Sequence, residues 1–319
     1  MGSNQELSKR VYVSELKEYF HLKQITGGEE SLKRWIIAPD INRPGLELAG
    51  YKDTTDLKRV VIIGNKECNV LNTMDYQTQR ARFEFITDSY TPCIIMTGGN
   101  KAPAALVEIA NLRDFPVFET DWVTYMTIQN VVGYLSRKLA PDTSMHGVML
   151  NIYGKGVLIT GQSGIGKSEL ALELIRRGHN FISDDRVEIS RIQNDLICRA
   201  PEILKGMLEI RGVGIIDINA MFGASTLLES CNLDLVIRLE DYGETHENNR
   251  LSYPQDSIDI LGLSCPVLNI PITPGRLLSV IIEAAVSNFR LMEKGINSTE
   301  DFKERVFRVI SEKNKGAGV

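Results

Sequence analysis

Residues 156–175 read GVLITGQSGIGKSELALELI, and this stretch decides the fold of the second half of the chain. It opens with a short apolar run that is typical of a buried strand, and it closes with a helical pattern of apolar residues. Between them lies GQSGIGKS, which matches the phosphate-binding consensus G-x-x-x-x-G-K-[ST] in full. The stretch therefore predicts a strand, a tight loop and a helix, in that order.

The loop has the chemistry that a polyphosphate requires. Its glycines let the backbone aim several N–H groups at phosphate oxygens, and the helix that follows adds its positive N-terminal dipole. We expect Lys167 to reach the outer phosphates and Ser168 to bind Mg²⁺. The predicted phosphate loop consists of Gly161, Gln162, Ser163, Gly164, Ile165, Gly166, Lys167 and Ser168.

Several nucleotide-dependent classes are excluded by motifs that the chain lacks. No N-K-x-D is present, so a guanine-specific GTPase is not expected, and L-S-G-G-Q, which marks ABC-type ATPases, is also missing. Neither H-R-D nor D-F-G occurs, which excludes the eukaryotic protein-kinase fold.

A pair of carboxylates follows the loop by about one helix. Asp184 and Asp185 end the apolar segment Phe181-Ile182-Ser183, and this segment would form a strand close beside the loop strand. One carboxylate would organise Mg²⁺ and the other would act on a hydroxyl proton. The alternatives are a polar turn without chemistry, or a site built instead on Glu240 and Asp241 after another apolar strand. We favour Asp184 and Asp185.

Two further candidates stay open when only residue patterns are considered. His146 precedes the loop by fifteen positions, and a lone histidine is more often structural than catalytic. Residues 208–218 (LEIRGVGIIDI) carry Glu209 and Arg211 inside an apolar run. Either this is an ordinary strand with glycine bulges, or Glu209 contacts a metal and Arg211 a phosphate.

Composition limits the remaining possibilities. With 319 residues the chain is long enough for about two domains. Its net charge of −5 lacks the basic field of a non-specific nucleic-acid binder. The five scattered cysteines form no C-x-x-C pair, which favours the reducing cytoplasm. No apolar run is long enough to predict a membrane span.

The organisation predicted is that of an α/β protein with two domains, residues 1–139 and 140–319. In the first, RVVIIG (59–64), PCIIMTG (92–98) and PVFE (116–119) read as strands of a parallel sheet, with a helix over 121–139. In the second, we expect paired strands over 181–192 and 196–199, and a helix buried on all sides over 277–292. The glycine turn at 96–101 is interpreted as a tight turn, with an anion site as the alternative.

Five segments taken together carry a family resemblance. GVLITGQSGIGKSELALELI, FISDDRVEI, LEIRGVGIIDI, NNRLSY and PITPGR follow one another as they do in bacterial HPr kinase/phosphorylase. LEIRGVGIID is close to diagnostic of this family, whereas the phosphate loop is generic. The resemblance is firm over about residues 140–295 and looser before them.

The resemblance implies an enzyme that phosphorylates a serine of the phosphocarrier HPr with ATP or pyrophosphate, and that removes this phosphate by phosphorolysis. It implies a C-terminal kinase domain similar to phosphoenolpyruvate carboxykinase, a homohexamer, Mg²⁺, control by fructose bisphosphate and phosphate, and a role in carbon catabolite repression. The alternative is a small-molecule kinase or carboxykinase-like enzyme.

By the same resemblance, residues 208–217 serve both directions, and residues 271–276, with Arg276 as their only cation, serve dephosphorylation. The catalytic positions are His146, Lys167, Asp185 and Arg250, and the Mg²⁺ ligands are Ser168 and Glu209.

Overall fold

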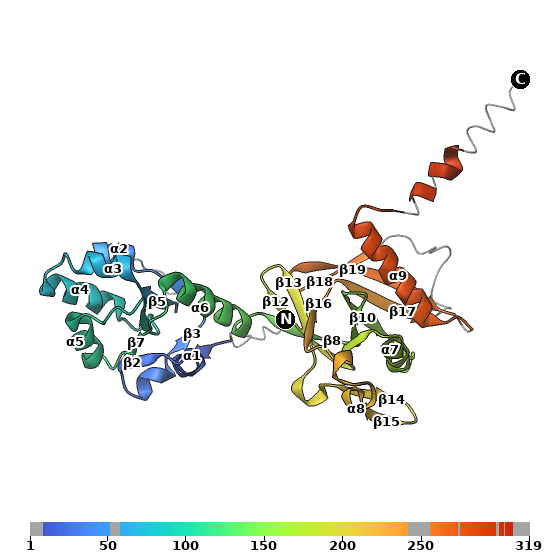
Figure 1. Cartoon of the computed structure of the whole chain (residues 1–319), viewed down its shortest axis with the longest axis horizontal. Coiled ribbons are helices and arrows are strands. Elements are labelled where there is room, and N and C mark those ends of the chain that lie inside the picture. Colours follow the sequence, from blue (N-terminus) through green and yellow to red (C-terminus); the bar gives the residue numbers. More distant parts are fainter. Residues whose placement is uncertain are drawn as a thin grey trace, which may run out of the picture. The chain divides into compact units, whose positions relative to one another are not determined.

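The computed structural model describes residues 9–51, 58–241, 256–273, 275–297, 300–302 and 304–308. The chain divides into two compact units, Met1–Ala140 and Pro141–Val319, and both are mixed α/β structures (Figure 1). Within the described ranges, no helix combines the length and the apolar character that crossing a membrane requires.

A five-stranded sheet forms the centre of the N-terminal unit. Its four neighbouring strands β4 to β7 are parallel, and β2 pairs with β7 in the antiparallel direction at one edge. The predicted strands at RVVIIG, PCIIMTG and PVFE are confirmed as β5, β6 and β7. The order across the sheet is β2 (Lys23–Thr26), β7 (Val117–Glu119), β6 (Ile94–Met96), β5 (Val60–Ile63) and β4 (Ile41–Asn42).

Helices cover both faces of this sheet, because its central strands are apolar on both sides. Val60 and Ile62 face one core with α1 (Val13–Phe20) and α6 (Thr124–Lys138), which confirms the helix predicted over 121–139. Val61 and Ile63 face a second core. The helices of that core are α2 (Gly45–Ala49), α3 (Asn65–Leu71), α4 (Tyr76–Ile86) and α5 (Ala104–Leu112). A small pair, β1 (Val11–Tyr12) with β3 (Trp35–Ile36), and the short helix η1 (Glu30–Lys33) complete the unit.

The C-terminal unit contains a six-stranded and a four-stranded sheet. In the larger sheet β10, β17 and β19 run parallel, and the other three strands are antiparallel to their neighbours. Its order is β11 (Asn180–Ser183), β9 (Val148–Ile152), β10 (Lys155–Gly161), β17 (Leu235–Asp241), β19 (Leu263–Ile272) and β18 (Asp256–Ile260). The smaller, antiparallel sheet has the order β16 (Ser230–Asn232), β13 (Asp195–Arg199), β12 (Arg186–Ile192) and β8 (Asp142–His146).

Successive residues of β10 point to opposite faces of the larger sheet and pack in two different cores. Val157 and Ile159 pack in the core with α7 (Lys167–Arg176) and α9 (Leu278–Glu293), whereas Leu158 packs in a core with the smaller sheet. A separate hairpin, β14 (Met207–Ile210) and β15 (Gly214–Asp217), packs against α7. Along the chain, the short helix η2 (Glu202–Leu204) precedes this hairpin, and α8 (Ile218–Phe222) and the short helix η3 (Ala224–Thr226) follow it.

Three expectations are corrected here. The strand predicted over 181–192 is two strands in different sheets, because the chain turns at Asp184 and at Asp185, whose φ is +64°. The strand β11 does not lie beside β10, because β9 lies between them. The helix α9 is not buried on all sides, since its buried residues form one face. The expected pairing of 196–199 with the preceding strand is confirmed as β12 with β13.

Candidate active site

The carboxyl ends of β10, β17 and β19 lie along one edge of the larger sheet, since the three strands are parallel. The phosphate loop begins there, at Gly161, which lies opposite Leu239 in the register of β10 and β17. A Cβ atom at Gly161 would lie 2.9 Å from the carbonyl oxygen of Leu239, so the loop requires glycine at this point. Ligands of α/β sheets bind at this kind of edge.

The loop leads directly into α7, whose first residue is Lys167. The Lys167 Nζ donates hydrogen bonds to the carbonyl oxygens of Gly161 (3.0 Å) and Gln162 (2.9 Å), so the ammonium group lies over the loop. This is the arrangement predicted from GQSGIGKS, with a cation and a helix N-terminus at one place.

The carboxylate of Asp184 connects the loop to the rest of the site. Its two oxygens accept from the Ser168 hydroxyl at 3.2 and 3.1 Å, and one of them also accepts from the backbone N–H of Glu209 at 3.2 Å. Asp184 is only 6% exposed. Burial raises the pKa of this carboxyl, and the hydrogen bonds from Glu209 and Ser168 oppose that rise without cancelling it.

The neighbouring Asp185 has the opposite environment. Its side chain is 75% exposed, and its Oδ1 lies 3.3 Å from the Nδ1 of His146. The carbonyl oxygen of Asp185 accepts from the N–H of Gly147 and lies 3.0 Å from the same histidine nitrogen. Because Asp185 has a left-handed backbone, the chain can bury one carboxylate and present the next one to solvent.

The hairpin β14–β15 borders the same place. Besides the bond from Glu209 to Asp184, the guanidinium Nη1 of Arg211 lies 3.6 Å from the point where a Cβ of Gly164 would stand. The structure therefore brings six predicted residues or segments together: the phosphate loop with Lys167 and Ser168, Asp184, Asp185, His146, Glu209 and Arg211.

Other predicted positions lie at or beyond the edge of this site. The rival pair Glu240 and Asp241 ends β17, beside the start of the loop, but the structure joins Ser168 to Asp184 instead. Pro271 and Ile272 end β19 at the same sheet edge, and Arg276 is exposed. Arg250 and Pro274 lie outside the described residues.

The groups around Ser168 fit Mg²⁺ by their chemistry. The hydroxyl of Ser168 and the carboxylates of Asp184 and Glu209 are oxygen ligands, which Mg²⁺ prefers, and it is usually held by one or two carboxylates together with substrate phosphates. In the part of the chain that the structure describes, no group of three or more His, Cys, Asp or Glu side chains could hold a metal by itself.

Sequence reasoning did not assign Asp184 a role of its own. Asp184 directly follows three residues that the structure buries, Phe181 to Ser183, and its own side chain is buried as well. The sequence offered a polar turn here only as the alternative without chemistry, whereas the structure has a turn at Asp185 that separates the two carboxylates.

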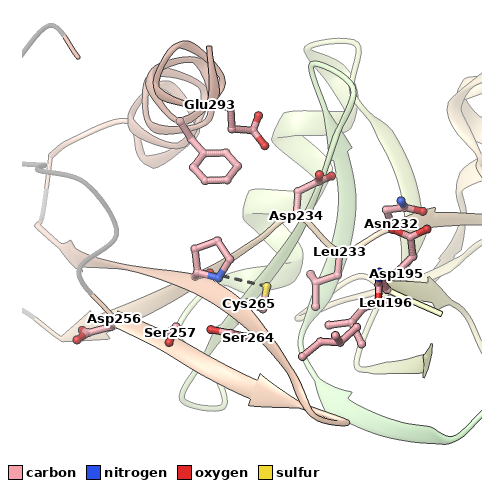
Figure 2. A pocket seen from close by; sticks show the side chains of 14 residues that line it. Asp195, Leu196, Asn232, Leu233, Asp234, Asp256, Ser257, Ser264, Cys265 and Glu293 are labelled. Carbon is pink, nitrogen blue, oxygen red and sulfur yellow. Dashed lines mark hydrogen bonds between the residues drawn. The ribbon is translucent and has the colours of Figure 1, made fainter. Parts of the chain in front are cut away.

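A cavity of about 560 Å³ lies at the opposite edge of the larger sheet, where β17 and β19 begin (Figure 2). Its lining includes Asp195, Asp234, Asp256 and Glu293, and none of the predicted site residues. Asp234 and Glu293 are both paired with Lys155, at 3.0 and 2.8 Å. The cavity is therefore separate from the phosphate loop.

Comparison with known proteins covers both units. The family described as HPr Serine kinase C-terminal domain matches residues 137–306, and the one described as HPr Serine kinase N terminus matches residues 11–135. The HPr kinase/phosphorylase of Exiguobacterium sibiricum is 39% identical over 311 residues, covering 97% of this chain and 100% of the relative. That of Geobacillus thermodenitrificans is 40% identical over 304 residues, with coverages of 95% and 98%.

A solved structure is also similar. The Hpr(Ser) kinase/phosphatase from Coxiella burnetii shares 37% sequence identity and has a TM-score of 0.47, covering 50% of this chain and 98% of that chain.

Proposed function

The chain belongs to the HPr kinase/phosphorylase family, and from this premise we propose that it phosphorylates a serine of HPr and removes that phosphate again. The enzyme uses a nucleotide phosphoryl donor, as a kinase does. Phosphate-dependent removal, with pyrophosphate as product, is the reverse activity. The proposal assigns catalysis to the C-terminal unit, which contains the phosphate loop.

Within the site, the phosphate loop holds the donor. Its N–H groups and the start of α7 bind phosphate oxygens, and Lys167 moves from its loop carbonyls to the transferred phosphoryl group. Ser168, Asp184 and Glu209 would hold Mg²⁺, which when bound neutralises charge on the phosphates. Asp184 also fixes the hydroxyl of Ser168 and the start of β14.

The proton is carried by Asp185. In the forward direction its carboxylate accepts the seryl proton as the serine oxygen bonds to phosphorus and the bond to the donor breaks. In reverse, the protonated carboxyl returns a proton to the serine oxygen while inorganic phosphate attacks, which gives HPr and pyrophosphate. His146 positions this carboxylate through its Nδ1. Arg250, by resemblance, stabilises the transferred charge.

One observation favours a protein as the phosphoryl acceptor over a small molecule. Asp185 is 75% exposed, although it lies one residue from a buried carboxylate that contacts the phosphate loop. A metabolite kinase usually encloses its acceptor to exclude water, whereas an exposed base suits a serine on the surface of another protein.

The test combines both directions. HPr, Mg²⁺ and ATP should give phosphoseryl HPr, and phosphoseryl HPr with phosphate should give pyrophosphate, both measured by mass spectrometry and a pyrophosphate assay. Turnover of a small hydroxy compound with none of HPr would contradict the proposal.

The finer assignments belong to the same proposal. Pyrophosphate should replace ATP, since one phosphate cradle suits both donors. The family resemblance further supports a homohexamer, effects of fructose bisphosphate and phosphate, and a role in carbon catabolite repression.

A further inference from the structure

The hairpin β14–β15 carries exposed apolar side chains beside charged ones on its outward face. Its inward residues Leu208 and Ile210 are buried in the core with α7, as the alternation of a strand requires. Outward positions of such a hairpin are normally polar, because they face water. Here Ile215 on β15 and Val213 in the turn are each 73% exposed. We call Val213 and Ile215 the apolar ridge.

The ridge lies beside the reacting groups. Ile215 is the cross-strand partner of Glu209, and directly paired residues point to the same face with Cβ atoms about 5 Å apart. The backbone N–H of Glu209 donates to Asp184, which in turn accepts from Ser168 of the phosphate loop. The ridge and the proposed Mg²⁺ ligand Glu209 therefore share one exposed surface.

We propose that the apolar ridge docks the protein that carries the acceptor serine, by contacting an apolar patch next to that serine. This inference rests on the proposed function and names the surface that recognises its protein substrate. A nucleotide or phosphate gains little from exposed aliphatic side chains, whereas exposed apolar groups at the rim of a site are typical of a protein interface.

The position of the ridge also decides between two protein occupants. A second copy of this chain seated on it would cover the face that carries Glu209, and with it the approach to the site. The substrate protein must itself reach that face, so it can bury the ridge and present its serine in one orientation.

The experiment makes the ridge polar while keeping its side chains branched at Cβ. Val213→Thr exchanges a methyl group for a hydroxyl, and Ile215→Thr exchanges an ethyl group for a hydroxyl. For the double variant we expect the KM for HPr to rise about tenfold, by more than kcat at saturating HPr changes. Leu112→Gln on α5, an exposed apolar residue of the other unit, is the control and should leave both constants unchanged.

A second measurement does not depend on the variants. Amide hydrogen exchange of residues 207–217 in the unmodified enzyme should slow when HPr is added. An unchanged KM in the double variant, or unchanged exchange at saturating HPr, would overturn the docking role alone. A change in oligomeric state by light scattering with an unchanged KM would assign the ridge to contacts between copies. If the unmodified enzyme transferred nothing to HPr, the proposed function would fail first.

Discussion

Each unit contains a loop with successive or nearly successive glycines at the carboxyl end of a buried parallel strand. In the N-terminal unit it is residues 96–101 after β6, and in the C-terminal unit it is the phosphate loop after β10. Both contain glycines with positive φ, Gly98 and Gly99 in the first, Gly164 and Gly166 in the second. The backbone alone does not distinguish them.

The two loops differ in where their polar groups find partners. In the first, Lys101 pairs with the buried Glu119 at 3.0 Å, and Asn100 donates to Asn65 and to the carbonyl of Thr97. Burial opposes ionisation of Glu119, but bonds from Lys101 and the Ala102 N–H outweigh it and lower its pKa. This is a closed tight turn, the interpretation favoured for 96–101.

In the phosphate loop, no carboxylate of the described residues pairs with the cation. The bonds that the structure gives for the Lys167 ammonium go to loop carbonyls, and the nearby Asp184 has a raised pKa. A buried carboxylate that resists ionisation costs stability, and such costs are typical of binding sites. The comparison therefore separates a structural loop from a functional one.

The largest expected effect distinguishes the two lysines. Lys167→Ala should lower phosphoryl transfer to HPr roughly 10³-fold and weaken nucleotide binding, because it removes charge stabilisation at the phosphates. Lys101→Ala should change neither by more than about twofold, since Lys101 belongs to the closed turn and pairs with Glu119 at the end of β7. Single-turnover transfer and calorimetric titration measure the two effects. Similar losses in both variants would remove the distinction.

The next effect isolates the proton carrier. Asp185→Asn should lower transfer about 10²- to 10³-fold and leave nucleotide affinity unchanged, because the amide cannot accept the seryl proton. Asp121→Asn is the matched control, since Asp121 lies next to Gly99 of the closed loop. A loss of nucleotide affinity in Asp185→Asn would assign this residue to binding.

A third prediction concerns the far end of α7, which anchors the helix that carries the phosphate loop. Glu283 on α9 accepts two bonds from Arg177 (2.9 and 2.6 Å) and lies 2.9 Å from Nε2 of the buried His179. The bond from Arg177, against the opposing effect of burial, and the contact with His179 lower the pKa of Glu283 from 4.5 to about 2.

Because the pKa of Glu283 is lower in the folded state than in the unfolded state, its ionised form stabilises the fold above about pH 4.5. This stabilisation is lost as pH falls from about 4.5 towards 2. Glu283→Gln should therefore reduce the free energy of unfolding by about 1–2 kcal/mol at pH 7, with a smaller difference below pH 4. Urea unfolding followed by far-UV circular dichroism measures it. Glu229→Gln, which breaks the exposed pair with Lys205, should have no measurable effect.

The smallest effects have opposite signs for the buried carboxylates that contact the two loops, Asp184 and Glu119. Asp184→Asn should raise the free energy of unfolding at pH 7 by about 1 kcal/mol, because burial raises the pKa of the carboxylate that it removes. Below about pH 3.8 this gain should vanish, since the carboxyl is then protonated in both states.

Glu119→Gln should lower stability by about 1 kcal/mol, because the pKa of Glu119 is lowered. Both tryptophans, Trp35 and Trp122, lie in the N-terminal unit, so their fluorescence reports unfolding of that unit. A stabilised Glu119→Gln variant would contradict the comparison.

Local patterns were enough to predict much of the molecule. The buried strands of the first unit, the helix α6, and the strand, loop and helix around GQSGIGKS all follow from residues that are neighbours in the sequence. His146 was less certain from spacing alone, and the structure gives it a partner in Asp185, 39 residues away. The assignment of β11 and β12 to different sheets was missed, because a polar turn between two strands does not indicate which sheet each strand joins.

The sequence by itself determined where phosphates can bind, since a loop of glycines between a strand and a helix is set by its own backbone. Only the tertiary structure decided which carboxylate enters the interior, which one meets the solvent, and which face of the hairpin remains apolar. These choices depend on strands that meet across long intervals of chain, where the packing of distant residues outweighs any local preference.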